Sequence, residues 1–148
     1  LWNGGCHVHE KFSVEAIIKL KQEHPEAVVM AHLECKAPVL AVADVKGSTA
    51  TMLHYAQEHP EIKEYIIATE AGILHELERN CPNVIFYPVP PEVSEGGVGC
   101  SCNECEYMKM NTLKKIYNAL KFGWPTVEVA PEIAKKAVKP IEKMLSLS

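Results

Sequence analysis

Three cysteines, Cys100, Cys102 and Cys105, lie close together in a segment rich in Gly and Ser. Thiolates bind zinc and iron–sulfur clusters tightly, and a CxxC spacing lets one loop present two of them. A structural zinc site normally needs four ligands, and the sequence has no second CxxC. The segment therefore predicts a site for a metal ion or an iron–sulfur cluster. One version of this prediction is a structural zinc ion held by these three Cys and a His. A Cys102–Cys105 dithiol with a redox role is the alternative.

Cys6 and His9 form a second group of metal-binding type, in a loop preceded by Gly4 and Gly5. Thiolate and imidazole are both ligands of transition metals. Their spacing places both side chains in one turn. The alternative for His9 is an ordinary surface or hydrogen-bonding histidine.

His32 and Glu34 directly follow a short apolar run at 27–31. Side chains two residues apart in extended chain point to the same side, so we expect the imidazole and the carboxylate to be neighbours. Such a pair can perform acid–base catalysis. The alternative is a packed His beside a helix-capping Glu. Cys35, the next candidate, is interpreted as a small buried apolar residue, and Cys81 likewise.

Ser48 and Thr49 follow Gly47 at the expected start of a helix. Hydroxyls and amides at a helix N-terminus bind anionic groups. Plain N-capping by Ser48 explains the motif equally well. Thr69 and Glu70 make a similar polar group after the next apolar run, where an acidic residue early in a helix complements the helix dipole.

These candidate residues are separated by short apolar runs that alternate with helical patterns. Continuous apolar runs bounded by turns are typical of buried parallel strands. We expect strands at 27–31, 43–45, 65–68 and 84–87, and helices at 14–24, 38–43 and 47–58 and from the 69–72 segment to about 80. Alternation of this kind predicts an α/β fold with a parallel sheet covered on both faces. Ligands of such sheets gather beyond the carboxyl ends of the strands, which is where His32, Thr49 and Thr69 fall.

Beyond 88 the composition changes, because Pro, Gly, Ser and Cys dominate to about 106. A loop of this length is typical of a functional segment. An amphipathic helix is expected at 111–122 with Asn111 as its N-cap, followed by a short strand at 127–129. A final helix should begin at Pro131, since Pro fits the first turn, and end near 147.

Composition limits the function classes. The chain has 148 residues, 47% of them hydrophobic, a formal charge of −4 and six Cys. No basic field invites nucleic acid, and no apolar run reaches the roughly 18 residues of a membrane span. A charged and apolar leader is missing, so we expect cysteines that bind a metal or cluster in the cytoplasm rather than disulfides. The start at Leu1 suggests a piece of a longer protein.

Taken in order, the motifs resemble the quinolinate synthase A family over nearly the whole chain. They are Gly5-Cys6-x-Val8-His9-Glu10, His32-x-Glu34-Cys35, Gly47-Ser48-Thr49, Thr69-Glu70-x-Gly72-x-x-His75 and Cys102-x-x-Cys105-x-x-Met108-x-Met110-Asn111-Thr112-Leu113. The sequence departs from the family at Leu33 and Glu106, where Pro is usual, and neither change removes a ligand.

The resemblance implies an enzyme that condenses iminoaspartate with dihydroxyacetone phosphate to form quinolinate for NAD biosynthesis. L-aspartate oxidase or aspartate dehydrogenase would supply the first substrate. It also implies three similar three-layer αβα domains around a pseudo-threefold axis, each giving one Cys to a central [4Fe-4S] cluster. Residues 1–6 would end the middle domain, 7–104 would form a complete αβα domain with the cluster loop, and 105–148 would be a C-terminal tail packing on a missing first domain.

The same resemblance assigns roles to individual residues. Cys6 and Cys105 match cluster ligands, and Cys102 matches a neighbouring Cys of some members that pairs with Cys105 under oxidation. The substrate-binding positions are His9, His32, Glu34, Ser48 and Thr49, with His32 and Glu34 as catalytic residues. The family's first cluster Cys has no counterpart here. We therefore expect this chain alone to be inactive and the full protein to be active.

Overall fold

The computed structural model describes residues 4–92 and 103–147. The chain divides into two compact units, Leu1–Lys109 and Met110–Ser148. The first contains a sheet and all of the candidate site residues, so it is described first.

The first unit contains a four-stranded parallel sheet in the order β2-β1-β3-β4. Its strands are β1 (Val28–His32), β2 (Val45–Gly47), β3 (Glu64–Ala68) and β4 (Ile85–Pro88). In the register of the sheet, Met30 of β1 pairs with Val45 on one side and with Ile67 on the other. The predicted α/β class and parallel sheet are confirmed.

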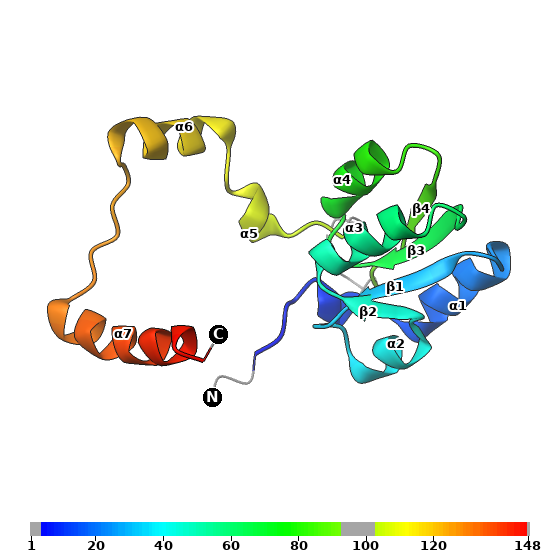
Figure 1. Cartoon of the computed structure of the whole chain (residues 1–148), viewed down its shortest axis with the longest axis horizontal. Helices are drawn as coiled ribbons and strands as arrows, with labels where there is room; N and C mark the ends of the chain where they lie inside the picture. Colours follow the sequence, from blue (N-terminus) through cyan, green and yellow to red (C-terminus); the bar gives the residue numbers. More distant parts are fainter. Residues whose placement is uncertain (1–3, 93–102, 148) are drawn as a thin grey trace. The chain divides into compact units, whose positions relative to one another are not determined.

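Helices cover both faces of this sheet (Figure 1). One layer contains α1 (Val14–Glu23) and α2 (Ala37–Val42), and the other contains α3 (Thr49–Glu58) and α4 (Ile73–Asn80). Side chains of a strand alternate between faces, so Val29 and Ala31 pack on the α1–α2 side while Met30 packs against Met52 and Leu77 on the other. The two apolar clusters make a three-layer αβα unit, as predicted.

Local signals fix where the helices begin. Ser13 caps α1 by accepting a hydrogen bond from Ala16 N, and Ser48 caps α3 by accepting one from Thr51 N. Each bond satisfies an N–H group that has no partner inside its helix. Gly47 ends β2 directly against α3, where an added Cβ would lie 2.5 Å from Thr51 Cβ. A side chain at Gly47 would therefore displace the first turn of α3.

Several features differ from the sequence prediction. Ala43 ends α2 rather than starting a strand, and Asp44 uses its carboxylate to accept a hydrogen bond from Val29 N at 2.8 Å. Residues 127–129 form no strand, because the described part of their unit offers no neighbouring strand to pair with. The N-cap of the amphipathic helix is Thr112, which accepts from Lys115 N, and not Asn111.

The second unit consists of α6 (Leu113–Phe122) and α7 (Pro131–Leu145) in its described part. Gly123 ends α6 with φ 63°, a left-handed conformation that glycine adopts at little cost. The short helix α5 (Glu106–Lys109) belongs to the first unit. Among the residues that the structure describes, no helix combines the length and apolar character needed to cross a membrane.

Replacing Leu77 with Ala should lower the free energy of unfolding by about 2 to 5 kcal/mol, since the side chain is fully buried in the α3–α4 layer. Urea unfolding followed by circular dichroism measures the change. Leu33→Ala is the matched control because Leu33 is 61% exposed. Equal losses in the two variants would contradict the assigned core.

Candidate functional site

A cavity of about 510 Å³ opens at the carboxyl edge of the sheet. Ligands of open α/β sheets bind at this edge. Eight residues singled out in the sequence lie on its wall: Cys6, His9, His32, Glu34, Thr49, Thr69, Glu70 and Cys105. They come from the segment before α1, the end of β1 and the turn after it, the first residue of α3, the loop after β3 and the segment after β4. The fold therefore assembles one site from distant parts of the chain.

The segment before α1 delivers both Cys6 and His9. Glu10 N donates to Cys6 O at 3.0 Å, which closes one turn, and the short 3-10 helix η1 (His9–Lys11) continues it. Val8 and Phe12 anchor this segment in the core beside α1. The predicted single turn holding Cys6 and His9 is confirmed.

His9 links Glu34 to Thr69 by hydrogen bonds. Its Nδ1 lies 3.1 Å from Glu34 Oε2 and its Nε2 lies 3.0 Å from Thr69 Oγ1. A carboxylate can only accept, so Nδ1–H donates to Glu34, and in the neutral ring Nε2 then accepts from the Thr69 hydroxyl. The arrangement is a carboxylate–imidazole–hydroxyl chain with the His tautomer fixed by its two partners.

His9 is buried, and its surroundings lower its pKa. The residue is 6% exposed. Burial, followed by the charge of the neighbouring His32, lowers the pKa of His9, although the Glu34 carboxylate opposes the shift. The rings of His9 and His32 stack at 4.2 Å with an interplanar angle of 6°.

His32 and Glu34 are neighbours for a reason other than the one expected. Glu34 lies in a turn after β1, not in extended chain, and its N–H donates to His32 Nδ1 at 3.3 Å. His32 Nδ1 and Glu34 Oε2 are 3.6 Å apart. Because Nδ1 accepts, the neutral His32 ring carries its proton on Nε2 and can donate it to a ligand.

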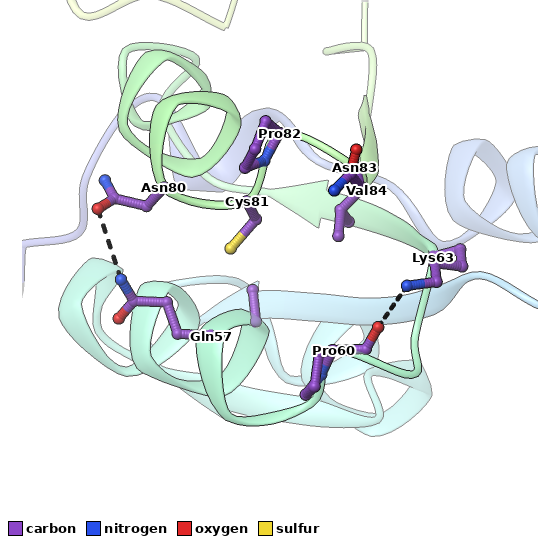
Figure 2. A pocket seen from close by; sticks show the side chains of 9 residues that line it. Gln57, Pro60, Lys63, Asn80, Cys81, Pro82, Asn83 and Val84 are labelled. Carbon is purple, nitrogen blue, oxygen red and sulfur yellow. Dashed lines mark hydrogen bonds between the residues drawn. The ribbon is translucent and has the colours of Figure 1, made fainter.

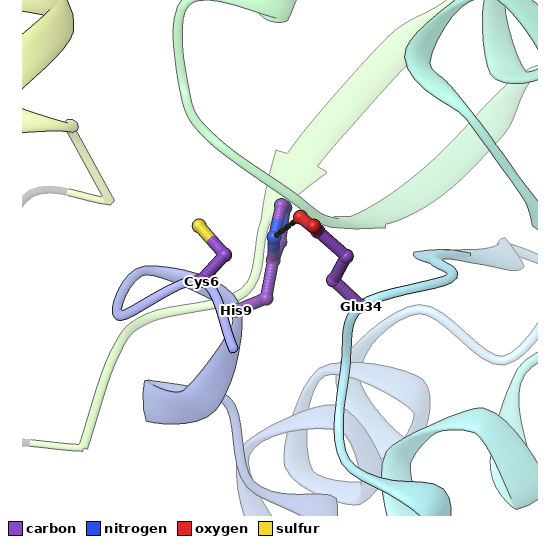
Figure 3. A group of neighbouring side chains, drawn as sticks. All are labelled: Cys6, His9 and Glu34. Atoms are coloured by element: carbon purple, nitrogen blue, oxygen red, sulfur yellow. Dashed lines mark hydrogen bonds and ion pairs between the residues drawn. The ribbon is translucent and has the colours of Figure 1, made fainter. Parts of the chain in front are cut away.

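Cys6, His9 and Glu34 could also hold a metal ion, because their ligand atoms all lie within 4.8 Å of one another. Figure 3 shows the His9 ring lying between the Cys6 thiol and the Glu34 carboxylate. Cys6 and Cys105 are half-buried free thiols on the wall of the same cavity. This donor set fits a thiolate-bound metal or cluster that is partly open to a ligand.

Some predicted residues lie elsewhere. Ser48 is absent from the cavity wall, since its hydroxyl bonds Thr51 N and lies 3.0 Å from Thr51 Oγ1. Cys35 and Cys81 are buried as expected. Cys100 and Cys102, with the zinc and dithiol alternatives that need them, lie outside the described residues.

Sequence reasoning placed Thr69 at this edge without naming its partner, and it gave Met108 no role; both residues line the cavity. Thr69 is 1% exposed and bonds His9. Its position directly after β3 is the signal that places it at the carboxyl edge of the sheet. Met108, on α5, gives no comparable signal.

A second cavity of about 290 Å³ lies at the opposite, amino-terminal edge of the sheet. Figure 2 shows it between the ends of α3 and α4, with the Cys81 sulfur turned into the space between them. Gln57 and Asn80 approach across its mouth at 3.5 Å. It contains none of the predicted site residues, and the carboxyl edge remains the candidate site.

In the metal-free protein, Cys6 and Cys105 should react with iodoacetamide while Cys35 and Cys81 stay unmodified. Burial raises the pKa of Cys35 to about 11, and its thiol donates to Ala68 O at 3.5 Å. Burial also raises the pKa of Cys81. Only thiolates react, so mass spectrometry after labelling at pH 8 should separate the two pairs. Labelling of Cys35 at the rate of Cys6 would contradict this burial.

Known proteins that resemble this chain share one description. Residues 1–146 match the model of the family described as quinolinate synthetase A protein. A quinolinate synthase of Prochlorococcus marinus (strain MIT 9303) is 46% identical over 147 residues, which are 99% of this chain and 42% of the relative. Those of Microcystis aeruginosa and Chloroherpeton thalassium are each 43% identical over 148 residues, which are 100% of this chain and 44% of each relative.

The chain thus spans less than half the length of these relatives. The match nevertheless runs along almost all of its residues. It includes each segment that lines the cavity at the carboxyl edge of the sheet. The chain belongs to the quinolinate synthetase A family.

Proposed function

We propose that this chain is part of a quinolinate synthase that condenses iminoaspartate with dihydroxyacetone phosphate, releasing two waters and phosphate, in de novo NAD biosynthesis. The observation that carries the proposal is the convergence of Cys6, His9, Glu34 and Cys105 on one cavity, in a chain of this family. Iminoaspartate comes from L-aspartate oxidase or aspartate dehydrogenase, and the enzyme is cytoplasmic.

The cofactor in this proposal is a [4Fe-4S] cluster held by Cys6, Cys105 and a third thiolate from a part of the protein before residue 1. Two half-buried free thiols on one cavity wall suit two of these ligand positions. When bound, such a cluster offers an iron without a protein ligand, which acts as a Lewis acid toward a departing hydroxyl.

Loss of water beside a carbonyl requires a base that removes a proton from carbon and an acid that returns one. Glu34 fits this role because its carboxylate lines the cavity and its side chain is 56% exposed. The His9 Nδ1–H donates to the Glu34 carboxylate, and Thr69 holds His9 in the tautomer that presents this N–H. Glu34 is therefore the proposed acid–base residue. His9 hydrogen-bonds its carboxylate, and Thr69 in turn hydrogen-bonds His9.

The substrates are anionic, so the site needs hydrogen-bond donors. The Nε2–H of His32 is one, and the Thr49 hydroxyl at the start of α3 is another. Ser48 is proposed as a binding residue on the resemblance alone, since its hydroxyl already caps α3. His9 completes the proposed binding set.

The remaining domain assignment also belongs to this proposal. Residues 1–6 end a middle domain, 7–104 form one αβα domain of the pseudo-threefold enzyme, and 105–148 pack on its first domain. The exposed apolar side chains of α6 and α7 support such packing; they include Leu113, Leu120, Ile133, Ile141 and Leu145. Exposed apolar faces of this kind mark interaction surfaces.

The test compares the full-length protein with this chain, both purified and reconstituted with iron and sulfide without oxygen. The full-length protein should be brown and form quinolinate from the two substrates, whereas the chain alone should form none. Quinolinate formed by the isolated chain would refute the need for a third thiolate. A colourless, zinc-loaded full-length protein without this activity would refute the proposed function.

A further inference from the structure

The segment that carries Cys105 is anchored at both ends. Asn103 is buried and its side-chain amide donates to Val89 O. Cys105 lies at the start of α5, where its carbonyl accepts from Lys109 N at 3.0 Å. Tyr107 of α5 meets His7 edge-on, with ring centroids 5.4 Å apart. The thiol is therefore carried by a short segment with its own fixed contacts.

Glu70 makes the contact that reaches Cys105 itself. Its Oε1 accepts from Cys105 N at 3.2 Å, and its Oε2 accepts from Gly72 N at 2.7 Å. Between these bonds, Ala71 N donates to Asn103 O at 2.9 Å. The loop after β3 and the Cys105 segment are thus joined by one carboxylate and one backbone bond.

This geometry differs from the expectation that Glu70 lies early in a helix and only complements its dipole. Helix α4 begins at Ile73, so Glu70 precedes it. The bond from Gly72 N to Glu70 stabilises the turn that contains both residues. The bond from Cys105 N to Glu70 instead joins residues that are 35 positions apart in the sequence. Hydrogen bonds to a carboxylate are shorter and stronger than those between neutral groups, so this link has a structural effect beyond the turn.

Gly72 leaves the space that the carboxylate occupies. A Cβ at this position would lie 2.6 Å from Glu70 Oε2. Gly72 has φ −60°, an ordinary helical value, so glycine is required here for space and not for backbone conformation. A methyl group at residue 72 would push the Glu70 carboxylate away while leaving residue 70 unchanged.

We propose that Glu70 is a positioning residue for the cluster: its carboxylate clamps the Cys105 backbone so that the thiol is set before the cluster binds. The inference rests on the proposed function, in which Cys105 is a cluster ligand. Residues that hydrogen-bond a metal-ligating residue fix its orientation. At other metal sites their replacement changes metal affinity by about 10- to 100-fold. In this proposal Glu70 acts through the backbone of the ligating residue, so it is a positioning residue and not a catalytic residue.

The first measurement is independent of the cluster. In metal-free full-length protein, Glu70→Ala and Gly72→Ala should each speed hydrogen exchange of the Cys105 amide about tenfold, since each removes a hydrogen bond to a charged group. Exchange in β1 and β3 should stay as in the unaltered protein, which shows that the fold is intact. Glu78→Ala is the matched control, an exposed carboxylate on α4 that lies outside the cavity wall.

The second measurement is the release of iron from the reconstituted full-length protein to a chelator without oxygen. Both variants should release iron about tenfold or more faster than the Glu78→Ala control. Unchanged exchange at the Cys105 amide would overturn the clamp. Faster exchange with unchanged iron release would overturn its role in positioning a cluster ligand. Cys105→Ser tests the proposed function separately: if it keeps a full cluster, Cys105 is not a ligand, whatever the exchange rates show.

Discussion

Glu34→Gln in the full-length protein should lower the rate of quinolinate formation by about 100-fold or more, with the iron content unchanged. A positioned acid–base group contributes roughly 10²- to 10⁴-fold to rate. The Gln side chain retains an oxygen that can accept from His9 Nδ1–H, the bond seen at 3.1 Å. It cannot take a proton from carbon, so the variant removes the chemistry and keeps the geometry.

Glu78→Gln is the matched control for this variant, since Glu78 is an exposed carboxylate outside the cavity wall. The assay measures quinolinate by chromatography after anaerobic reaction with saturating substrates. A normal rate in Glu34→Gln would reject Glu34 as the acid–base residue. In that case His32, the other titratable neighbour of Glu34 on the wall, would be the next residue to replace.

Cys6→Ser should remove the cluster. A hydroxyl replaces one of only three proposed thiolates, and alcohols are poor ligands for iron–sulfur clusters at neutral pH because they remain protonated. The purified, reconstituted full-length variant should be nearly colourless, with iron and sulfide close to background and no quinolinate formed. Iron and sulfide assays with the visible spectrum give the result.

Cys81→Ala serves as the control for a lost thiol. Cys81 packs in the apolar core under α3 and α4, whereas Cys6 packs against the apolar core on the other face of the sheet. This control should keep its colour and iron content. A brown Cys6→Ser protein with full iron would show that the cluster is held by other residues.

The sheet was predictable because its signals are local. The apolar runs of β1 and β3 are buried on both faces, and Ser13 and Ser48 cap their helices where the sequence places them. The same reasoning failed at 127–129, where a short β-branched pattern suggested a strand. A strand depends on a neighbour that supplies its hydrogen bonds, and no local pattern reveals whether that neighbour exists.

The site was predictable in part. Ligands gather beyond the carboxyl ends of parallel strands, and this rule brought His32, Thr49 and Thr69 to one place. The Cys6–His9 spacing indicated a shared turn. The bonds of His9 could not be predicted, because its partners Glu34 and Thr69 lie 25 and 60 residues away in the chain. For Ser48 the sequence allowed two roles, anion binding and helix capping, and could not decide between them. In the structure its hydroxyl caps α3.

Cys6 precedes the first helix of the αβα unit, and Cys105 follows its last strand. A group bound by both thiols would tie the beginning of this unit to its end, as a covalent cross-link does. Closing a loop of roughly 100 residues removes unfolded-state entropy worth about 4.7 kcal/mol in the chain-entropy treatment of cross-links. Loss of such a group would then loosen the whole unit as well as change the site.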